Sequence, residues 1–176
     1  MTNQQTMKKY LNQAVIAPLR EKGFTGTYPH FRRSCKGCVE LISFLTNKWG
    51  GSFTVELSAV FPGAVDTNYV AKDPIDEKTV TVWDTNRRYR LKGMVDGWFH
   101  YRDLYMKRNL FYGKIHLEAP VSPTADFTVP KGYKPAQIFS DQTAAEICEE
   151  VNKQLLNGFQ WLEKLERKYA VDVHQV

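Results

Sequence analysis

Cysteine is scarce in this sequence: the 176 residues contain three, at positions 35, 38 and 148. A chain of this length buries roughly 70% of the surface that it exposes when unfolded, so its core does not need disulfide bonds. Long apolar runs are missing as well, and the only run near the N-terminus, AVIA, is too short for the core of a signal peptide. The composition is 43% hydrophobic and 24% charged, as in ordinary globular proteins rather than disordered tails or membrane proteins. We therefore expect one cytoplasmic domain that spans residues 1–176.

Known catalytic signatures are also missing from the sequence. It has no P-loop, no glycine-rich dinucleotide fingerprint, no nucleophile elbow and no histidine pair at helical spacing beside a glutamate. Its four histidines, at positions 30, 100, 116 and 174, show no spacing that suggests joint metal ligation. We therefore expect no metal, no cofactor and no enzyme of a familiar mechanistic class. A site assembled from distant residues is invisible to this argument.

The one formal motif is Cys35-Lys36-Gly37-Cys38. A structural zinc site needs four ligands, but Cys148 stands alone on a helical stripe and His30 is the only imidazole nearby in the sequence. A thioredoxin-like site needs its cysteines between a strand and the start of a helix, whereas strand-like residues flank this motif on both sides. We expect a two-residue hairpin turn with the cysteines facing each other across it. A thiol redox function through Cys35 and Cys38 remains an alternative.

Residues 38–61 contain two strand-like runs joined by the turn-like segment NKWGGS. In the second run, apolar residues alternate with polar ones, which is the period of a strand with one buried face. Val60 is the exception on the polar face. The first run is apolar on both faces, which favours an interior strand. These runs predict the central hairpin of an antiparallel sheet. The alternating apolar residues are Phe53, Val55, Leu57, Ala59 and Phe61.

Further strands are expected on both sides of this hairpin. Residues 30–35 form one strand if Phe31, Arg33 and Cys35 share a face, and a turn at 36–37 leads into the hairpin. We expect a surface loop at 62–78 and irregular structure at the proline-rich residues 119–136. Three more strands are expected, and a short helix precedes the last of them. These strands span residues 79–83, 87–94 and 113–117.

Two amphipathic helices are predicted, one near each end of the chain. The first spans residues 5–22, with a break near Ile16 because Pro18 removes a helical hydrogen bond, and it ends at Gly23. The second begins at Ser140 or Asp141, or one turn later with a capping box, and runs to about Tyr169. Its Gly158 is expected to be a weak point. The predicted fold class is α+β, with an antiparallel sheet of about five to seven strands and both helices packed on one face.

The net charge of +5 is concentrated in one part of the chain. Residues 79–116 contain eight basic and three acidic residues, whereas the rest of the chain contains 16 of each sign. Such a segment attracts an acidic protein, nucleic acid or a small anion, although moderately basic surfaces are common in proteins that bind none of these. In the competing interpretation the aromatic rings of residues 83–112 pack in the core and the arginines are simply solvated.

We expect the sheet face away from the helices to carry Arg88 and Arg90, with Trp98, His100 and Tyr101 near its rim. Arginine and aromatic residues anchor many protein interfaces. These five residues are the predicted binding site for an acidic protein partner, as in an immunity or adaptor protein. Single-stranded nucleic acid is the alternative partner, because arginines grip phosphates while rings stack on bases.

Several short motifs resemble a bacterial family of uncharacterised proteins, domain of unknown function 4304. The resemblance extends from the first helix to about Tyr101 and includes the closing helix. It implies an α+β domain without an assigned activity, so no catalytic residues are carried over. Cys35 and Cys38 do not belong to the family pattern, and the proline-rich stretch after Asp103 has no counterpart in it. The motifs are Gly23-Phe24, Phe31-Arg32-Arg33, Asn47-Lys48, Gly51-Ser52-Phe53-Thr54-Val55, Arg90-Leu91 and Asp96-Gly97-Trp98-Phe99.

Overall fold

The computed structural model describes residues 3–47, 51–61, 76, 78–93, 97–101 and 140–172, with side chains as far as residue 169. Its helical elements are α1 (Asn3–Leu11), the π-helical turn η1 (Asn12–Ile16), α2 (Ala17–Glu21), the 3-10 turn η2 (Val82–Asp84) and α4 (Asp141–Asp172). Its strands are β1 (Thr25–Thr27), β2 (His30–Cys35), β3 (Cys38–Thr46), β4 (Ser52–Val60), β5 (Tyr89–Arg90) and β6 (Phe99–His100). The fold class is α+β, as predicted.

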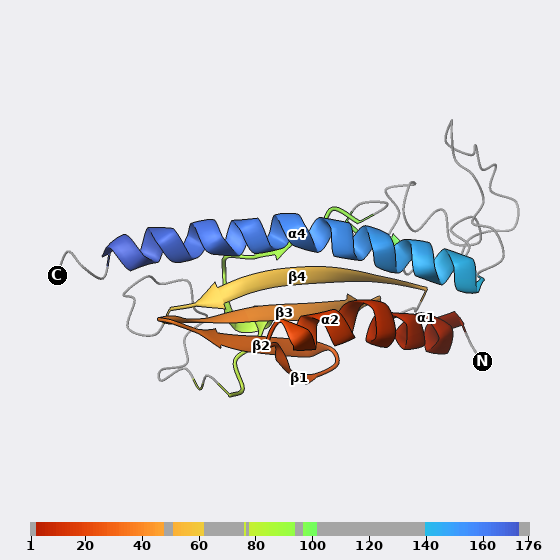
Figure 1. Cartoon of the computed structure of the whole chain (residues 1–176), viewed down its shortest axis with the longest axis horizontal. Coiled ribbons are helices and arrows are strands. Elements are labelled where there is room, and N and C mark those ends of the chain that lie inside the picture. The colour runs from red at the N-terminus through yellow and green to blue at the C-terminus, as the bar shows by residue number, and fades with distance from the viewer. Residues whose placement is uncertain are drawn as a thin grey trace, which may run out of the picture.

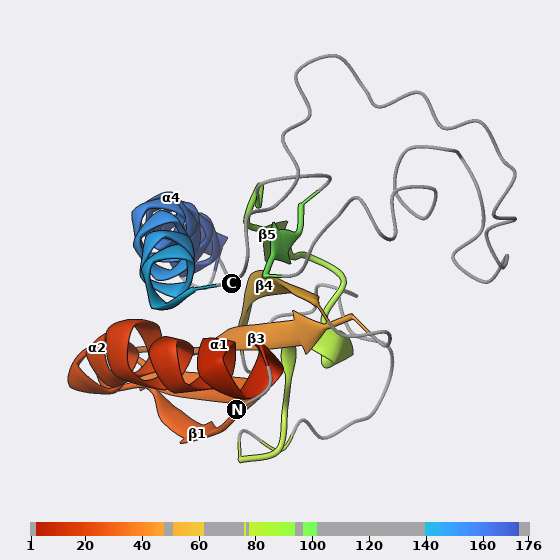
Figure 2. The same ribbon diagram turned by 90° about the vertical axis from the view of Figure 1, so that its right-hand side faces the viewer.

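The six described strands form one antiparallel sheet in the order β1-β2-β3-β4-β5, and β6 pairs with β4. The predicted central hairpin is β3 and β4, which pair from Val39 with Val60 to Thr46 with Phe53. The predicted turn at Lys36-Gly37 connects β2 to β3 and places Cys35 opposite Cys38. Helix α4 runs along the sheet, and α1 and α2 lie on the same face (Figure 1; Figure 2). The predictions of strand number and of helices on one face are confirmed.

The main core lies between this sheet face and the helices. The even-numbered residues of β3 and the odd-numbered residues of β4 face it, so Ile42 and Leu57 are fully buried there. The opposite face has a smaller apolar cluster, which explains Val60 on the otherwise polar side of β4. Its members are Val39, Leu41, Val60, Val80 and Val82.

The break in the N-terminal helix takes the form of the π-helical turn η1. Pro18 has no N–H, so the carbonyl of Ala14 lacks its helical donor, and the side-chain amide of Asn152 in α4 donates to it at 2.8 Å. Gly23 ends the helix with a φ of +88°. Phe24 N–H donates to the Leu19 carbonyl at 3.1 Å across this glycine. The break that proline predicts is therefore stabilised by the other helix.

Helix α4 begins where the sequence predicts, because the Ser140 hydroxyl accepts a hydrogen bond from Thr143 N–H at 3.2 Å. It continues to Asp172, three residues beyond the predicted end. Its Gly158 is buried, and a Cβ atom added there would lie 2.9 Å from Cδ2 of Leu57 in β4. The glycine thus allows the helix to approach the sheet closely. This close contact explains why glycine stands at position 158, although glycine is unfavourable within a helix.

Two strand predictions need correction. The strand expected at residues 79–83 is wrong, because the Thr81 hydroxyl and the Asp84 carboxylate form a reciprocal cap that turns residues 82–84 into η2. The strand expected at 87–94 is only Tyr89–Arg90. Pairing with β4 does not continue to Ser58. The Ser58 hydroxyl instead donates to the Arg87 carbonyl at 2.7 Å. The expected alternation nevertheless holds, since Tyr89 packs against the main core.

Other predictions fall wholly or largely outside the described residues. They concern the loop at 62–78, the short helix before residue 113, the strand at 113–117 and the irregular segment at 119–136. The extent of the single domain stays a prediction. Among the helices that the structure describes, none is both long and apolar enough to span a membrane.

Candidate functional site

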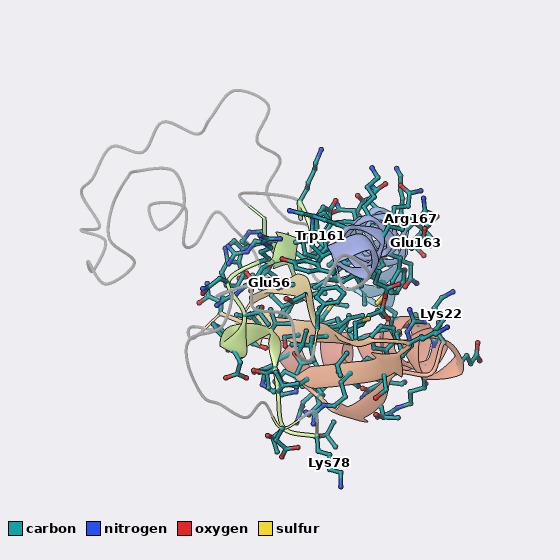
Figure 3. All side chains as sticks on the ribbon, turned by 90° about the vertical axis from the view of Figure 1, so that its left-hand side faces the viewer. Lys22, Glu56, Lys78, Trp161, Glu163 and Arg167 are labelled. Atoms are coloured by element: carbon teal, nitrogen blue, oxygen red, sulfur yellow. The ribbon has the colours of Figure 1, made fainter. Side chains whose placement is uncertain are left out.

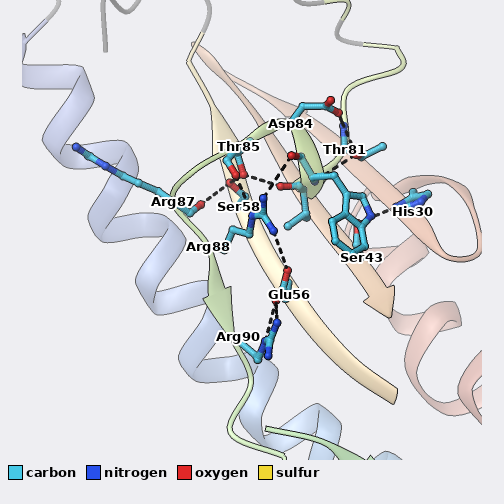
Figure 4. Close-up of polar contacts among 12 residues, drawn as sticks. His30, Ser43, Glu56, Ser58, Thr81, Asp84, Thr85, Arg87, Arg88 and Arg90 are labelled. Atoms are coloured by element: carbon cyan, nitrogen blue, oxygen red, sulfur yellow. Dashed lines mark hydrogen bonds and ion pairs between the residues drawn. The ribbon is translucent and has the colours of Figure 1, made fainter. Parts of the chain in front are cut away.

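Glu56 lies at the centre of the polar sheet face, and its side chain is buried (Figure 3; Figure 4). Arg90 is its partner across the strands and donates to Oε1 through Nε at 2.7 Å and through Nη2 at 2.5 Å. Arg88 Nη1 lies 3.7 Å from Oε2. Two arginines therefore share one buried carboxylate. This pairing offsets the high free-energy cost of burying a charged group.

Arg88 is also fixed by the backbone around η2. Its Nε donates to the Thr85 carbonyl at 2.8 Å and its Nη2 donates to the Trp83 carbonyl at 3.3 Å. Its guanidinium lies 5.7 Å from the centre of the Trp83 ring, and Trp83 is 50% exposed. We call Trp83, Arg88 and Arg90 the arginine surface.

The strand neighbours of the arginine surface continue the polar face across the sheet. His30 and Ser43 are paired by register, and Nδ1 of His30 lies 2.8 Å from the Ser43 hydroxyl (Figure 4). Ser43 in turn stands opposite Glu56. Burial, followed by the charge of Arg32, lowers the pKa of His30. His30 is thus a neutral member of this row near neutral pH.

The structure brings only part of the predicted binding site together. Arg88 and Arg90 lie on the expected face, and their side chains are 31% and 49% exposed. Trp98 is partly buried, while His100 is buried opposite Ser52 on that face. Placing Tyr101 at the rim is wrong: it is buried in the helix-side core, with its ring 6.3 Å from that of Phe53. The binding role of these residues stays a prediction.

A second group of polar residues lies at the turn end of the β2–β3 hairpin, on the helix side. The sulfur atoms of Cys35 and Cys38 and a carboxylate oxygen of Glu166 all lie within 4.8 Å of one another. The Cys38 thiol donates to Glu166 at 3.3 Å, and the cysteines are not joined by a disulfide. We call these three residues the cysteine cluster. They are the group in the described chain that has the right composition and spacing to hold a metal ion.

A buried ion pair lies beside the cysteine cluster. Arg33 donates to Glu40 at 2.5 Å, and Glu40 is 2% exposed. Arg33 also donates to the Lys22 carbonyl at 2.9 Å and lies over the ring of Phe24. The pair lines a cleft of about 440 Å³ whose other walls include Lys22 and residues of α4.

The surroundings of the cysteine cluster favour its protonated forms. Burial, followed by the hydrogen bond with Glu166, raises the pKa of Cys38 far above its ordinary value of 9.0. Burial and the nearby Glu40 charge raise the pKa of Cys35. Burial raises the pKa of Glu166 as well, despite its hydrogen bond from Cys38. The thiols are therefore not activated nucleophiles.

The part of the sequence that forms the sheet matches a known protein family. The family model described as domain of unknown function (DUF4304) matches residues 15–115. The chain belongs to this family. The DUF4304 match contains all six described strands and ends before α4 begins. No curated protein and no solved structure matches the chain.

Sequence reasoning about this DUF4304 protein missed two acids. Glu166 reaches Cys38 from 128 residues away, a distance that no motif spacing reveals. Glu40 was more accessible to prediction, since it lies two residues from both Cys38 and Ile42 on an interior strand. A charged residue in such a position needs a buried partner. That partner is Arg33, directly opposite in the register.

Proposed function

We propose that this protein is a non-enzymatic binding domain that holds an acidic protein segment on the arginine surface. The observation that carries the proposal is Trp83, a half-exposed ring with an arginine guanidinium against it. Tryptophan and arginine are the residues that most often dominate the affinity of an interface. A partner that covers Trp83 would meet both residue types at one place.

The arginine surface is held in position before any partner arrives. Glu56 fixes Arg90 through two hydrogen bonds, and two backbone carbonyls fix Arg88. Ordering a long side chain at an interface costs about 0.5–1.5 kcal/mol. Because the fold has already ordered these two arginines, binding avoids most of that cost.

Charge supports an acidic partner. Arg88 and Arg90 share the single carboxylate of Glu56, so the arginine surface keeps a positive charge after this pairing. The described residues 79–93 contain four basic side chains and one acidic one, Asp84. A positive patch speeds the encounter with an acidic partner more than it strengthens the final complex.

Single-stranded nucleic acid is the alternative partner, because Trp83 has an exposed face on which a base can stack. Only one such ring lies on the arginine surface, whereas non-specific single-strand binding uses several stacked bases along a groove. We therefore favour the protein partner. The thiol redox alternative loses support, because the pKa of both Cys35 and Cys38 is raised rather than lowered.

The test uses a fluorescently labelled peptide rich in glutamate, aspartate and leucine, and a labelled single-stranded oligonucleotide of equal charge. We expect the peptide to bind more tightly, and Trp83→Ala and Arg90→Gln each to weaken it at least about tenfold. Arg167→Gln on α4 is the matched control, since its side chain is 80% exposed and lies on another surface. Glutamine is preferred to glutamate at position 90 because a new acid beside Glu56 would destabilise the fold.

The natural partner is then sought by pull-down from lysate with and without nuclease treatment. Loss of the captured protein with Trp83→Ala but not with Arg167→Gln supports the proposal. If nuclease abolishes capture, or if the oligonucleotide binds more tightly than the peptide, the nucleic-acid reading replaces it. Equal binding by wild type and Trp83→Ala would show that the surface is wrongly placed.

A further inference from the structure

The β2–β3 hairpin presents its two cysteines in the manner of a metal-binding knuckle. Cys35 and Cys38 are register partners across the two-residue turn Lys36-Gly37, so both side chains point to the helix side. Gly37 adopts a φ of +86°, which closes the turn without strain. Two cysteines separated by two residues are a common half of a zinc site.

Helix α4 supplies the group that the sequence lacks nearby. Glu166 lies on the flank of the buried stripe that includes Leu162 and Leu165, and its carboxylate meets both sulfur atoms. The Cys38 thiol donates to Glu166 at 3.3 Å, and a separation of this size also suits two ligands on one tetrahedral ion once the thiol proton is lost. The three ligand atoms therefore come from two separate elements that packing holds together.

We propose that Cys35, Cys38 and Glu166 bind a divalent metal ion of the zinc class. Thiolates select zinc and similar borderline-soft ions over magnesium and calcium, which prefer oxygen ligands. Zinc accepts two sulfur atoms and a carboxylate oxygen in a tetrahedral arrangement and takes water at an open fourth position. The argument against zinc from sequence depended on the lack of a further ligand, and Glu166 supplies it.

The charge around the cysteine cluster fits a divalent ion. The neighbouring Arg33–Glu40 pair is neutral as a unit, so it does not compensate the ligands. Two thiolates and one carboxylate carry three negative charges, which a divalent ion reduces to one. Cys35 and Glu166 are only partly buried, which leaves a route for the ion from solvent.

This site is independent of the proposed function. The cysteine cluster lies on the helix side of the sheet, whereas the arginine surface lies on the opposite side. Failure of one proposal therefore leaves the other intact. Cobalt is the probe for the metal site, because Co²⁺ replaces Zn²⁺ in such sites and is coloured when thiolates bind it.

The experiment titrates the full chain, freed of metal by a chelator and kept reduced by a phosphine, with Co²⁺ and then Zn²⁺. We expect one Co²⁺ per chain, a sulfur-to-cobalt charge-transfer band and visible bands of tetrahedral cobalt, all removed by one equivalent of Zn²⁺. Loss of Cys35 or Cys38 to serine should abolish the charge-transfer band or halve it. Loss of a residue that only hydrogen-bonds to a metal ligand typically weakens metal binding by about 10–100-fold. Because Glu166 is proposed to be a ligand itself, Glu166→Gln should weaken Co²⁺ binding by more than this.

Two matched controls separate ligation from folding. Glu163→Gln changes an exposed acid one turn earlier on α4, and Cys148→Ala removes a buried cysteine that lies outside the cysteine cluster. Both should leave the cobalt spectrum unchanged, and circular dichroism checks that each variant is folded. A wild-type chain without a charge-transfer band overturns the proposal. So does a spectrum that Cys148→Ala removes, or one whose titration Glu166→Gln leaves unchanged.

Discussion

At the scale of single residues, Glu56 shows how one buried acid organises a surface. Glu56 is 3% exposed, and its carboxylate is held between Arg88 and Arg90, which belong to a segment with only two residues of strand pairing. Backbone pairing contributes little along such a short strand. The ion pairs with Glu56 therefore add to the burial of Tyr89 and Leu91 in holding residues 87–91 against β4.

Glu56→Gln is expected to lower the free energy of unfolding by about 1–3 kcal/mol, since charge-assisted hydrogen bonds are lost from a buried site. The cost stays below that of a fully buried pair because both arginines retain access to water. Urea denaturation of both proteins measures the difference. The Glu163 side chain is 63% exposed, so Glu163→Gln should change the free energy of unfolding by less than about 0.5 kcal/mol. Equal stability of the Glu56→Gln variant and the wild type would contradict this role.

At the scale of elements, the N-terminal helix and α4 depend on each other through Pro18. The proline leaves the Ala14 carbonyl without a helical donor, and Asn152 replaces that donor at 2.8 Å. We therefore expect the hydrogen bond of Asn152 to contribute more when residue 18 is proline than when residue 18 has an N–H. A double-mutant cycle detects such dependence directly.

Asn152→Ala should destabilise the wild-type protein by about 1 kcal/mol, the typical worth of one hydrogen bond. In a Pro18→Ala background, residue 18 has an N–H that donates to Ala14, so Asn152→Ala should cost much less. Chemical denaturation of the four proteins gives the coupling energy, which we expect to exceed about 0.5 kcal/mol. The same cost in both backgrounds would show that Asn152 does not serve the broken helix.

Elements with a strong period were predictable from sequence, and those fixed by side-chain hydrogen bonds were not. The alternation of Phe53, Val55 and Leu57 defined β4 and its buried face, because burial of one face imposes the period. The apolar residues 80 and 82 also alternate with polar ones. The capping hydrogen bonds between Thr81 and Asp84 nevertheless fix a 3-10 turn there instead of a strand.

The candidate sites were predictable only in part, for the same reason. Arg88 and Arg90 follow from strand alternation, but their shared partner Glu56 depends on sheet register. The cysteine cluster required Glu166, which tertiary packing brings from α4. Gly158 likewise looks unfavourable until Leu57 of the facing strand is considered.

At the scale of the whole molecule, the burial of Cys148 couples the stability of the fold to pH. Burial raises the pKa of Cys148 from its ordinary value of 9.0 to about 11. The unfolded chain loses this proton near 9.0 while the folded chain keeps it. The contribution of Cys148 is therefore complete below pH 9.0 and is lost as the pH rises through about 11.

We expect the free energy of unfolding to fall between pH 9.0 and about 11, and to fall less steeply in Cys148→Ala. Lysine and tyrosine also titrate in this range, so the difference in slope between the two proteins is the informative quantity. Urea denaturation across this pH interval, in the presence of a reductant and a chelator, measures it. Parallel curves would mean that Cys148 ionises equally in both states.

Helix α4 contacts the N-terminal helix and the β2–β3 hairpin, which are both synthesised early. Asn152 donates to Ala14, and Glu166 accepts from Cys38, 128 residues away in the sequence. A ribosome adds about 5–20 residues per second, so the described strands, which are all synthesised by residue 101, wait roughly 4–14 s for residue 172. During that interval Leu57 lacks the helix α4 that packs against it at Gly158 in the finished fold. Synthesis therefore exposes an apolar sheet surface on the nascent chain, the kind of surface that ribosome-associated chaperones bind.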